Sequence, residues 1–342
     1  MAPPNTAASL PVARALLHIG PAPYPTVGKG EIIVKVAAAA VNPLDYYIQD
    51  LGEKLISWLQ YPYISGADVA GTVVEVGSEV TRFKAGDRVV GYAASFESRA
   101  GGFQNYIVLD AQLTSPIPDD LSFTDASVLP LGFATAGCGL YQKDMLALEY
   151  PSLDPSPKPN GKTLLIWSGA SSVGSNAIQL AVASGYEVIT TSSPKNFEYC
   201  KRLGASQVFD YHLDAEVITR QLIDAFSGKE CAGGFAVQPG SEGVVFEVVR
   251  RSSGKKFVVC AREVPEGTTD GIEAKMVIAG FIKNHDVGDV LFTDILPALL
   301  AQKKIKCVPE PHVVGHGLEH LQKAFDQGKS GTVSARKLVI TL

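Results

Sequence analysis

The pattern of apolar and polar residues changes twice along the chain. From about position 14 to 110, the apolar residues fall in short β-prone runs that are separated by Gly, Pro and Asp. These runs predict strands at 32–37, 69–76, 88–92 and 103–109. The first region is therefore predicted to be an all-β module.

Helical periodicity takes over at 122–149, and a proline-rich connector at 151–159 leads into the second pattern. There, strand-like runs alternate with helical stretches, which is typical of a parallel, doubly wound sheet of about six strands. The strand-like runs lie at 163–167, 186–191, 206–211, 235–238, 255–261 and 276–281.

The last segment returns to the first pattern. A helix at 318–327 and a strand at 337–342 are predicted, and we expect that strand to rejoin the β module. The expected fold class is α/β, with a β domain made of 1–130 and 300–342 and a doubly wound domain made of 131–299.

A glycine-flanked turn after the strand at 163–167 is the first candidate for chemistry. The sequence KTLLIWSGASSVG runs from that strand through the turn into a helix at 175–184, whose backbone N–H groups would face a pyrophosphate. Compared with the pattern G-x-G-x-x-G, the middle glycine is replaced by serine. A purely structural turn is the alternative. The candidate phosphate-binding residues are Gly169, Ser171, Ser172, Val173 and Gly174.

The next strand indicates which nucleotide would bind. An NAD-binding unit places an acidic residue about 20 residues after the turn, where it holds the ribose 2′-hydroxyl. This chain instead has hydroxyl groups and one cation, at Thr191, Ser192, Ser193 and Lys195. Such a set suits a 2′-phosphate and favours NADPH. The alternative is that these residues only cap a helix at 196–203.

Composition narrows the class of protein further. The chain has 342 residues, 46% of them hydrophobic, and a net charge of -5, so it can bury the cores of two domains but offers no basic surface for nucleic acid. Its five cysteines are scattered without C-x-x-C spacing, which favours reduced thiols in a cytoplasmic setting. No targeting pattern is visible, and no apolar run reaches the roughly 20 residues of a membrane helix.

Several motifs together resemble one family. The run at 66–91, GADVAGTVVEVGSEVTRFKAGDRVVG, resembles the signature of medium-chain dehydrogenase/reductases. The segments VNPLD at 41–45 and 129–135, the phosphate turn and Gly204-Ala205 follow in the family's order, so the resemblance covers nearly the whole chain. It implies a GroES-like β domain joined to a Rossmann domain, with the substrate between them.

The chain departs from the zinc-dependent members of that family. Where they carry a zinc-binding Cys, this chain has Pro43 or Leu44, and where they carry the His of a GHE motif it has Ala67. The region 91–102 also lacks the cysteines of the family's structural zinc lobe. A catalytic zinc needs about three protein ligands, so we expect no metal, and we expect Asp68 to be a structural hydrogen-bond acceptor.

Without zinc to polarise a carbonyl, hydride is expected to reach an already electrophilic carbon, as in an enone, an enoyl thioester or a quinone. The resulting enolate oxygen needs hydrogen-bond donors, and the α-carbon needs a proton. The zinc-free, quinone-reductase-like branch is similar in its Asn, Asp and Tyr, here Asn42, Asp45 and Tyr47. Tyr47 is the candidate proton donor, Asn42 orders the site, and Asp45 alternatively only caps a helix. One of Tyr46 and Tyr47 is expected to pack in the core.

Further site residues follow from the resemblance alone. It implies that Thr135 orients the nicotinamide, that Ser193 and Lys195 bind the 2′-phosphate, and that Tyr211 stacks near the adenosine. It also implies that backbone groups at 259–262 and 279–282, around Cys260 and Phe281, lie near the nicotinamide and its carboxamide. The loop histidines His285, His312 and His316 are expected to be solvated.

Within the family, the runs at 167–211 and 331–342 are similar to stand-alone, trans-acting enoyl reductases. The predicted function is an NADPH-dependent reductase of an activated C=C bond that uses no metal. The alternatives are an NADPH-dependent quinone reductase and a non-catalytic nucleotide-binding scaffold or sensor. The expected partner is a small molecule or a thioester, free or borne on a carrier protein, with no nucleic acid and no membrane, and the protein is expected to be a monomer or a homodimer.

Overall fold

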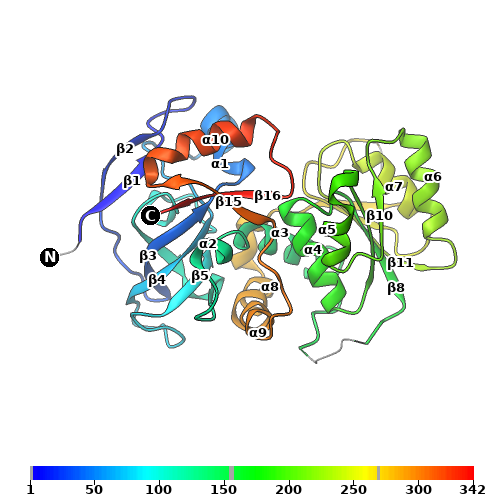
Figure 1. Ribbon diagram of the computed structural model, residues 1–342, viewed down its shortest axis with the longest axis horizontal. Coiled ribbons are helices and arrows are strands. Elements are labelled where there is room, and N and C mark those ends of the chain that lie inside the picture. The colour runs from blue at the N-terminus through cyan, green and yellow to red at the C-terminus, as the bar shows by residue number, and fades with distance from the viewer. Residues whose placement is uncertain (1–2, 154–157, 268–269) are drawn as a thin grey trace. The chain divides into compact units, whose positions relative to one another are not determined.

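The structure is a computed structural model that describes residues 3–153, 158–267 and 270–342 (Figure 1). The chain forms two compact units. Unit 1 contains Met1–Leu131 and Gly288–Leu342, and unit 2 contains Gly132–Val287. The expected connector at 151–159 lies partly outside the described residues.

The second boundary between the units falls earlier than the expected position 300. The helical turns η6 (Val290–Ile295) and α9 (Leu296–Ala301) contact strand β7 (Thr114–Pro116) of unit 1. Ser115 Oγ also donates a hydrogen bond to the Phe292 carbonyl at 2.6 Å, and both groups are buried. These contacts place the segment in unit 1.

Unit 1 is built on a mixed sheet with the strand order β15-β16-β3-β4-β5-β7, and β6 also pairs with β3. The last strand of the chain, β16, lies between β15, to which it is parallel, and β3, to which it is antiparallel, as expected from the sequence (Figure 1). A hairpin of β1 and β2 stands apart from this sheet. The strands are β1 (Asn5–Ser9), β2 (His18–Ala22), β3 (Glu31–Ala40), β4 (Asp68–Val76), β5 (Arg88–Tyr92), β6 (Tyr106–Asp110), β15 (Glu310–His316) and β16 (Arg336–Thr341).

The prediction of an all-β first module missed helix α1 (Pro43–Leu51). The helix begins after Asn42 with a proline at its first position, where the missing N–H costs no hydrogen bond. Helix α10 (Leu321–Lys329) contacts α1 and buries the apolar residues Leu321, Ala324 and Phe325. Phe325 of α10 belongs to the main core of unit 1 and Tyr46 of α1 packs against that core, whereas Ile48 of α1 belongs to a second, smaller cluster.

Unit 2 has the expected doubly wound architecture. All its strand pairs are parallel, and the main order is β10-β9-β8-β11-β13-β14. Figure 1 shows α4 and α5 on one side of this sheet and α6 and α7 on the other. The elements are β8 (Lys162–Ile166), α4 (Ser172–Ala183), β9 (Glu187–Ser192), α5 (Phe197–Arg202), β10 (Gln207–Asp210), α6 (Ala215–Ala225), β11 (Glu230–Ala236), α7 (Glu242–Arg251), β12 (Ser253–Gly254), β13 (Phe257–Cys260) and β14 (Glu273–Met276).

The strand predicted at 276–281 is wrong. Strand β14 ends at Met276, and a 3₁₀ helix, η5 (Ala279–Asn284), follows it. Ile278 and Phe281 are 46% and 47% exposed, so this apolar run is not the buried strand that its composition suggested. The remaining helices include α2 (Phe123–Ala126), α3 (Pro130–Tyr141) and α8 (Asp286–Asp289).

All five cysteines are free thiols, four of them buried. Burial raises the pKa of each thiol, to about 12 for Cys138, Cys260 and Cys307. The thiols therefore stay protonated at neutral pH and do not supply a thiolate nucleophile. Across the described residues, no helix combines the length and the apolar character that crossing a bilayer requires.

Candidate active-site residues and nucleotide-binding turn

The candidate residues fall into two groups, one in each unit. In unit 2, the turn after β8 begins at Ser168, which has a left-handed backbone (φ 64°), and leads into helix α4. Ser171 is the N-cap of that helix. Its hydroxyl accepts from the Gly174 N–H at 3.1 Å and donates to the Ser168 carbonyl at 2.7 Å. The serine that replaces the middle glycine therefore closes the turn by itself.

The two glycines of the turn are required by close packing. A Cβ on Gly174 would collide with the Ser168 carbonyl oxygen, and a Cβ on Gly169 would collide with the hydroxyl of Thr190 on β9. These contacts bring the start of α4 close to the ends of β8 and β9. The turn thus has the compactness of a dinucleotide-binding turn, although the middle glycine is absent.

Two backbone N–H groups and one hydroxyl group at the start of α4 are left for a ligand to bind. The N–H groups of Ser172 and Val173 have no carbonyl partner within the helix, because they lie in its first turn. The Ser172 Oγ is buried and has no hydrogen-bond partner. A phosphate oxygen at the positive end of the helix dipole would satisfy these groups, so the residues fit the pyrophosphate of a dinucleotide.

The ends of β9 and β10 carry the candidate 2′-phosphate residues. Ser193 Oγ donates to the Tyr211 hydroxyl at 3.1 Å, and both side chains are near the surface. Lys195 lies on the exposed turn η4 (Pro194–Asn196). Ser192 is buried and donates to the Ser193 carbonyl at 3.1 Å, so its side chain faces inward. The structure thus brings Ser193 and Tyr211 together. Lys195, two residues after Ser193, is exposed.

One carboxylate lies in this region, on the neighbouring strand. Asp210 of β10 pairs in register with Ser192. Its Oδ1 accepts from the His212 backbone N–H at 3.0 Å and lies 2.6 Å from the His212 Nδ1, and these bonds lower the pKa of Asp210. The Asp210 carboxylate is therefore already hydrogen-bonded to His212.

The residues predicted near the nicotinamide lie on three other elements of unit 2. Thr135 is half-buried on α3, whose Gly132 packs against the hydroxyl of Ser172 on α4. The Cys260 side chain is buried, and its carbonyl accepts from the Val277 N–H at 2.8 Å. Phe281 is half-exposed on η5. Contacts of Thr135, Cys260 and Phe281 with a nicotinamide stay predictions.

The group in unit 1 is a buried polar cluster at the start of α1. Lys337 of β16 and Asp68 of β4 form an ion pair with 2.9 Å between Nζ and Oδ2, and their side chains are 5% and 0% exposed. Asn42 lies between them. Its Oδ1 accepts from Lys337 Nζ at 2.5 Å, and its Nδ2 donates to Asp68 Oδ2 at 2.9 Å. The Leu131 N–H donates to Asp68 Oδ1 at 2.5 Å, so Asp68 is a structural acceptor, as expected.

Asp45 completes this cluster. Its carboxyl accepts from the Asn42 N–H at 2.7 Å and from the Gly66 N–H at 3.0 Å, which confirms a capping role at the first turn of α1. The pKa of Asp45 is raised to about 7, mainly by burial and also by the nearby Asp68, while the two backbone bonds and Lys337 oppose the rise. The Asp45 carboxyl therefore exchanges its proton near neutral pH.

The two adjacent tyrosines of α1 have different surroundings. Tyr46 packs against Phe325 with ring centroids 6.5 Å apart, and it also contacts Gly328. It contacts the core of unit 1, which confirms that one of the pair packs there. Tyr47 is half-buried and meets Tyr46 edge to face, with ring centroids 5.1 Å apart. Tyr46 therefore lies between the core and the candidate proton donor, Tyr47.

Sequence reasoning missed Lys337. The signal was a charged residue inside the apolar closing strand RKLVIT, because a fully buried lysine needs a partner. His285, His312 and His316 are exposed, as expected, but His312 and His316 lie on strand β15 and not in loops.

The residues of the cluster do not fit a zinc ion. Across the described ranges, no three side chains of His, Cys, Asp or Glu come together as a metal site. Asp68, the carboxylate next to Ala67, directs its Oδ2 at the Lys337 ammonium and the Asn42 amide. An ammonium group thus neutralises the Asp68 carboxylate, which follows the position of the zinc-binding histidine of the family.

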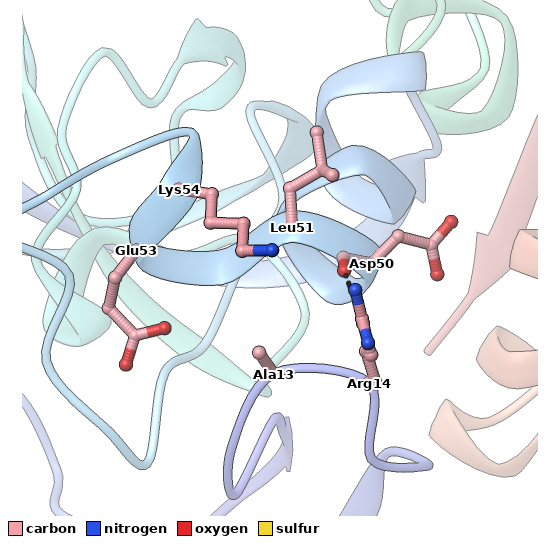
Figure 2. Close-up of a pocket in the computed structure, with 6 residues that line it drawn as sticks. All are labelled: Ala13, Arg14, Asp50, Leu51, Glu53 and Lys54. Carbon is pink, nitrogen blue, oxygen red and sulfur yellow. Dashed lines mark hydrogen bonds between the residues drawn. The ribbon is translucent and has the colours of Figure 1, made fainter.

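The far end of α1 borders a surface hollow of about 410 Å³, shown in Figure 2. Arg14 Nε donates to the Asp50 carbonyl at 3.3 Å there, and the Asp50 carboxylate pairs with Lys329 of α10 at 2.7 Å. None of the candidate residues lines this hollow. Its lining residues are Ala13, Arg14, Asp50, Leu51, Glu53 and Lys54.

Comparisons with known proteins agree with this architecture. Residues 28–119 match the alcohol dehydrogenase GroES-like domain. The chain is 44% identical to the dehydrogenase pigH of Monascus ruber, over 99% of this chain and 100% of that protein. It is 40% identical to the trans-enoyl reductase himH of Aspergillus japonicus, over 99% of this chain and 97% of that protein.

Among solved structures, the chain resembles the quinone oxidoreductase from Coxiella burnetii. The TM-score is 0.73, the identity is 25%, and the match covers 99% of this chain and all of that one. Taken with the two units and the turn described above, these similarities show that the chain belongs to the medium-chain dehydrogenase/reductase family, in its quinone oxidoreductase-like part, together with trans-enoyl reductases.

Proposed function

We propose that this oxidoreductase is an NADPH-dependent reductase of an activated C=C bond, such as that of an enone or an enoyl thioester, and that it uses no metal. The observation that carries the proposal is the buried ion pair of Asp68 and Lys337. In this pair the Asp68 carboxylate is bound to a lysine, so the position of the family's zinc motif offers no set of ligands for a metal ion that could polarise a carbonyl.

The choice of NADPH rests on the ends of β9 and β10. Ser193 and Tyr211 form a hydrogen-bonded pair, and Lys195 adds a cation on the adjacent turn. Strand β9 ends in Thr191 and Ser192, without a carboxylate for a ribose 2′-hydroxyl. Hydroxyl groups with a lysine suit a 2′-phosphate, which carries charge and accepts hydrogen bonds.

For catalysis, this chain must bind NADPH and the substrate, orient them, and supply a proton to the substrate. NADPH supplies the hydride when bound, and hydride addition to the β-carbon places negative charge on the carbonyl oxygen of the substrate. Tyr47 stabilises that oxygen by a hydrogen bond or protonates the α-carbon. Asn42, which is buried and held on both sides, orders the start of the helix that bears Tyr47.

The relatives support this reaction class. A trans-enoyl reductase is among the proteins that match the chain over nearly its full length. On that basis the substrate is a thioester borne on a carrier protein or a small enone. The likeness to a quinone oxidoreductase favours quinone reduction as the second candidate, in which the acceptor needs no dedicated proton donor.

The test is a screen of NADPH oxidation against enones, enoyl thioesters, quinones and aldehydes, each with and without a metal chelator. We expect turnover of the conjugated alkenes and no effect of the chelator. Turnover of quinones alone would favour the second candidate. Loss of alkene reduction in the presence of the chelator would contradict the proposal. Binding of NADPH without turnover of any acceptor would also contradict it.

A further inference from the structure

We propose that Lys337 is a positioning residue of the reductase: it fixes the orientation of the Asn42 amide and, through it, the start of helix α1. The inference rests on the proposed function, because it assigns Lys337 to the helix that carries Tyr47. Lys337 lies on β16, far from α1 in the sequence, and enters the cluster only through the pairing of β16 with β3.

The argument begins with the two ends of the Asn42 side chain. Its Oδ1 faces the Lys337 ammonium at 2.5 Å, and its Nδ2 faces the Asp68 carboxylate at 2.9 Å. A flip of the amide would turn NH₂ toward an ammonium and oxygen toward a carboxylate. The two opposite charges therefore select one amide orientation, and burial strengthens that selection because the local dielectric is low.

The Asn42 backbone passes this constraint to the helix. The Asn42 N–H donates to Asp45, and the Asp45 N–H donates back to the Asn42 carbonyl at 3.0 Å. Asp45 in turn accepts from the Gly66 N–H at the start of the neighbouring strand region. Through Asn42 and Asp45, the first turn of α1 is thus tied to β4, to Gly66 just before it, and to β16.

The other end of α1 has a separate set of contacts. Gln49 Nε2 donates to the Ala15 carbonyl at 2.9 Å, and Lys329 donates to Gln49 Oε1 and Asp50 Oδ1, both at 2.7 Å. Tyr47 lies between the two anchored ends. Loss of the first anchor would therefore tilt or loosen the helix at the tyrosine rather than detach it from the unit.

The simpler role for Lys337 is to neutralise the charge of Asp68. The following variants separate that role from the positioning of Asn42. Lys337→Met leaves Asp68 as an unpaired buried charge, so we expect a lower unfolding midpoint as well as a fall in kcat. The double variant Lys337→Met with Asp68→Asn removes both charges and should restore the midpoint. Since no charges then orient Asn42, kcat should stay reduced on the order of 10-fold to 100-fold.

The control is Lys303→Met, because Lys303 also pairs with an aspartate, Asp120 at 2.7 Å, but is 76% exposed. It should leave kcat and the midpoint unchanged. In the double variant we expect the Kd for NADPH to match the wild type, because the nucleotide residues lie in unit 2. Recovery of kcat together with stability would overturn the positioning role.

A second measurement keeps the inference independent of the proposed reaction. If the wild-type protein reduces no activated alkene, the proposed function is refuted. The role of Lys337 in holding the start of α1 can still be measured by amide hydrogen exchange. The N–H groups of Asn42 and Gly66, both bonded to Asp45, should exchange faster in the double variant than in the wild type. Unchanged protection of both would overturn the inference.

Discussion

Replacing Asp45 with Asn should remove a pH dependence of stability from unit 1. The carboxyl has a pKa of about 7 in the folded protein, against 3.8 for an ordinary aspartate. The folded state therefore keeps the proton over a range in which the unfolded state has lost it. Stability from this group is fully present below about pH 4 and is lost as the pH rises to about 7.

The size of this effect follows from the two pKa values. A difference of one pKa corresponds to about 1.4 kcal/mol, so the rise from 3.8 to about 7 corresponds to a loss of about 4 kcal/mol across the range. Asparagine does not titrate. It accepts one of the two backbone bonds that Asp45 now accepts and leaves the other donor unpaired, at a cost of about 1–3 kcal/mol. The variant should be the less stable protein at pH 4, and the deficit should shrink or reverse by pH 8.

The assay is urea unfolding at a series of pH values, followed by fluorescence. Trp58 lies in unit 1 and Trp167 in unit 2, so a Trp167→Phe background reports on unit 1 alone. Asp50→Asn is the matched control, because Asp50 lies on the same helix but is half-exposed and paired with Lys329. If the stability difference between Asp45→Asn and the wild type is the same at pH 4 and pH 8, the buried carboxyl does not hold a proton as described.

Three further predictions concern the nucleotide and the proton. Lys195→Ala should raise the Kd for NADPH roughly 10-fold or more and leave the Kd for NADH unchanged in calorimetric titrations, since a charged hydrogen bond is lost only with the 2′-phosphate; equal effects on both would contradict that assignment. Gly174→Ala should destabilise unit 2 by about 1–3 kcal/mol in thermal unfolding, because the new Cβ collides with the Ser168 carbonyl, whereas Gly243→Ala on α7, with open space around it, should cost nothing. Tyr47→Phe should lower kcat for enones by about 10²-fold or more and spare quinone reduction, and equal activity on enones in steady-state kinetics would remove Tyr47 from the mechanism.

Much of the fold could be predicted from the sequence, because the strands of both units follow local patterns of burial. The turn at Gly169 was recognisable for the same reason, since strand, turn and helix are contiguous there. The strand predicted at 276–281 failed because that reasoning takes apolar residues to be buried, and Ile278 and Phe281 are half-exposed.

The candidate site was less predictable, because its contacts join distant segments. Asn42 and Asp45 could be nominated from neighbouring residues, and so could the capping role of Asp45. Lys337 was signalled only by its charge within an apolar strand, and its partner could not be identified, since Asp68 stands on another strand and only the sheet order brings the two together. The buried state of Ser192 was also hidden, because the run of hydroxyl residues does not show which side chain faces inward.

The position of β16 inside the unit 1 sheet has a consequence for synthesis of the protein. Its residues, 336–341, leave the ribosome after all of unit 2, so unit 2 can fold while the end of β3 at 38–40, which pairs with β16, still lacks that neighbour. Until then Asp68 lacks its partner Lys337, and a short strand edge at 38–40 is open to other nascent chains, while β4 and β6 can already pair with the rest of β3. A chaperone that shields β3 during translation would act on this intermediate, and ribosome-bound chains that end before Arg336 should show a protease-resistant unit 2 beside a protease-sensitive unit 1.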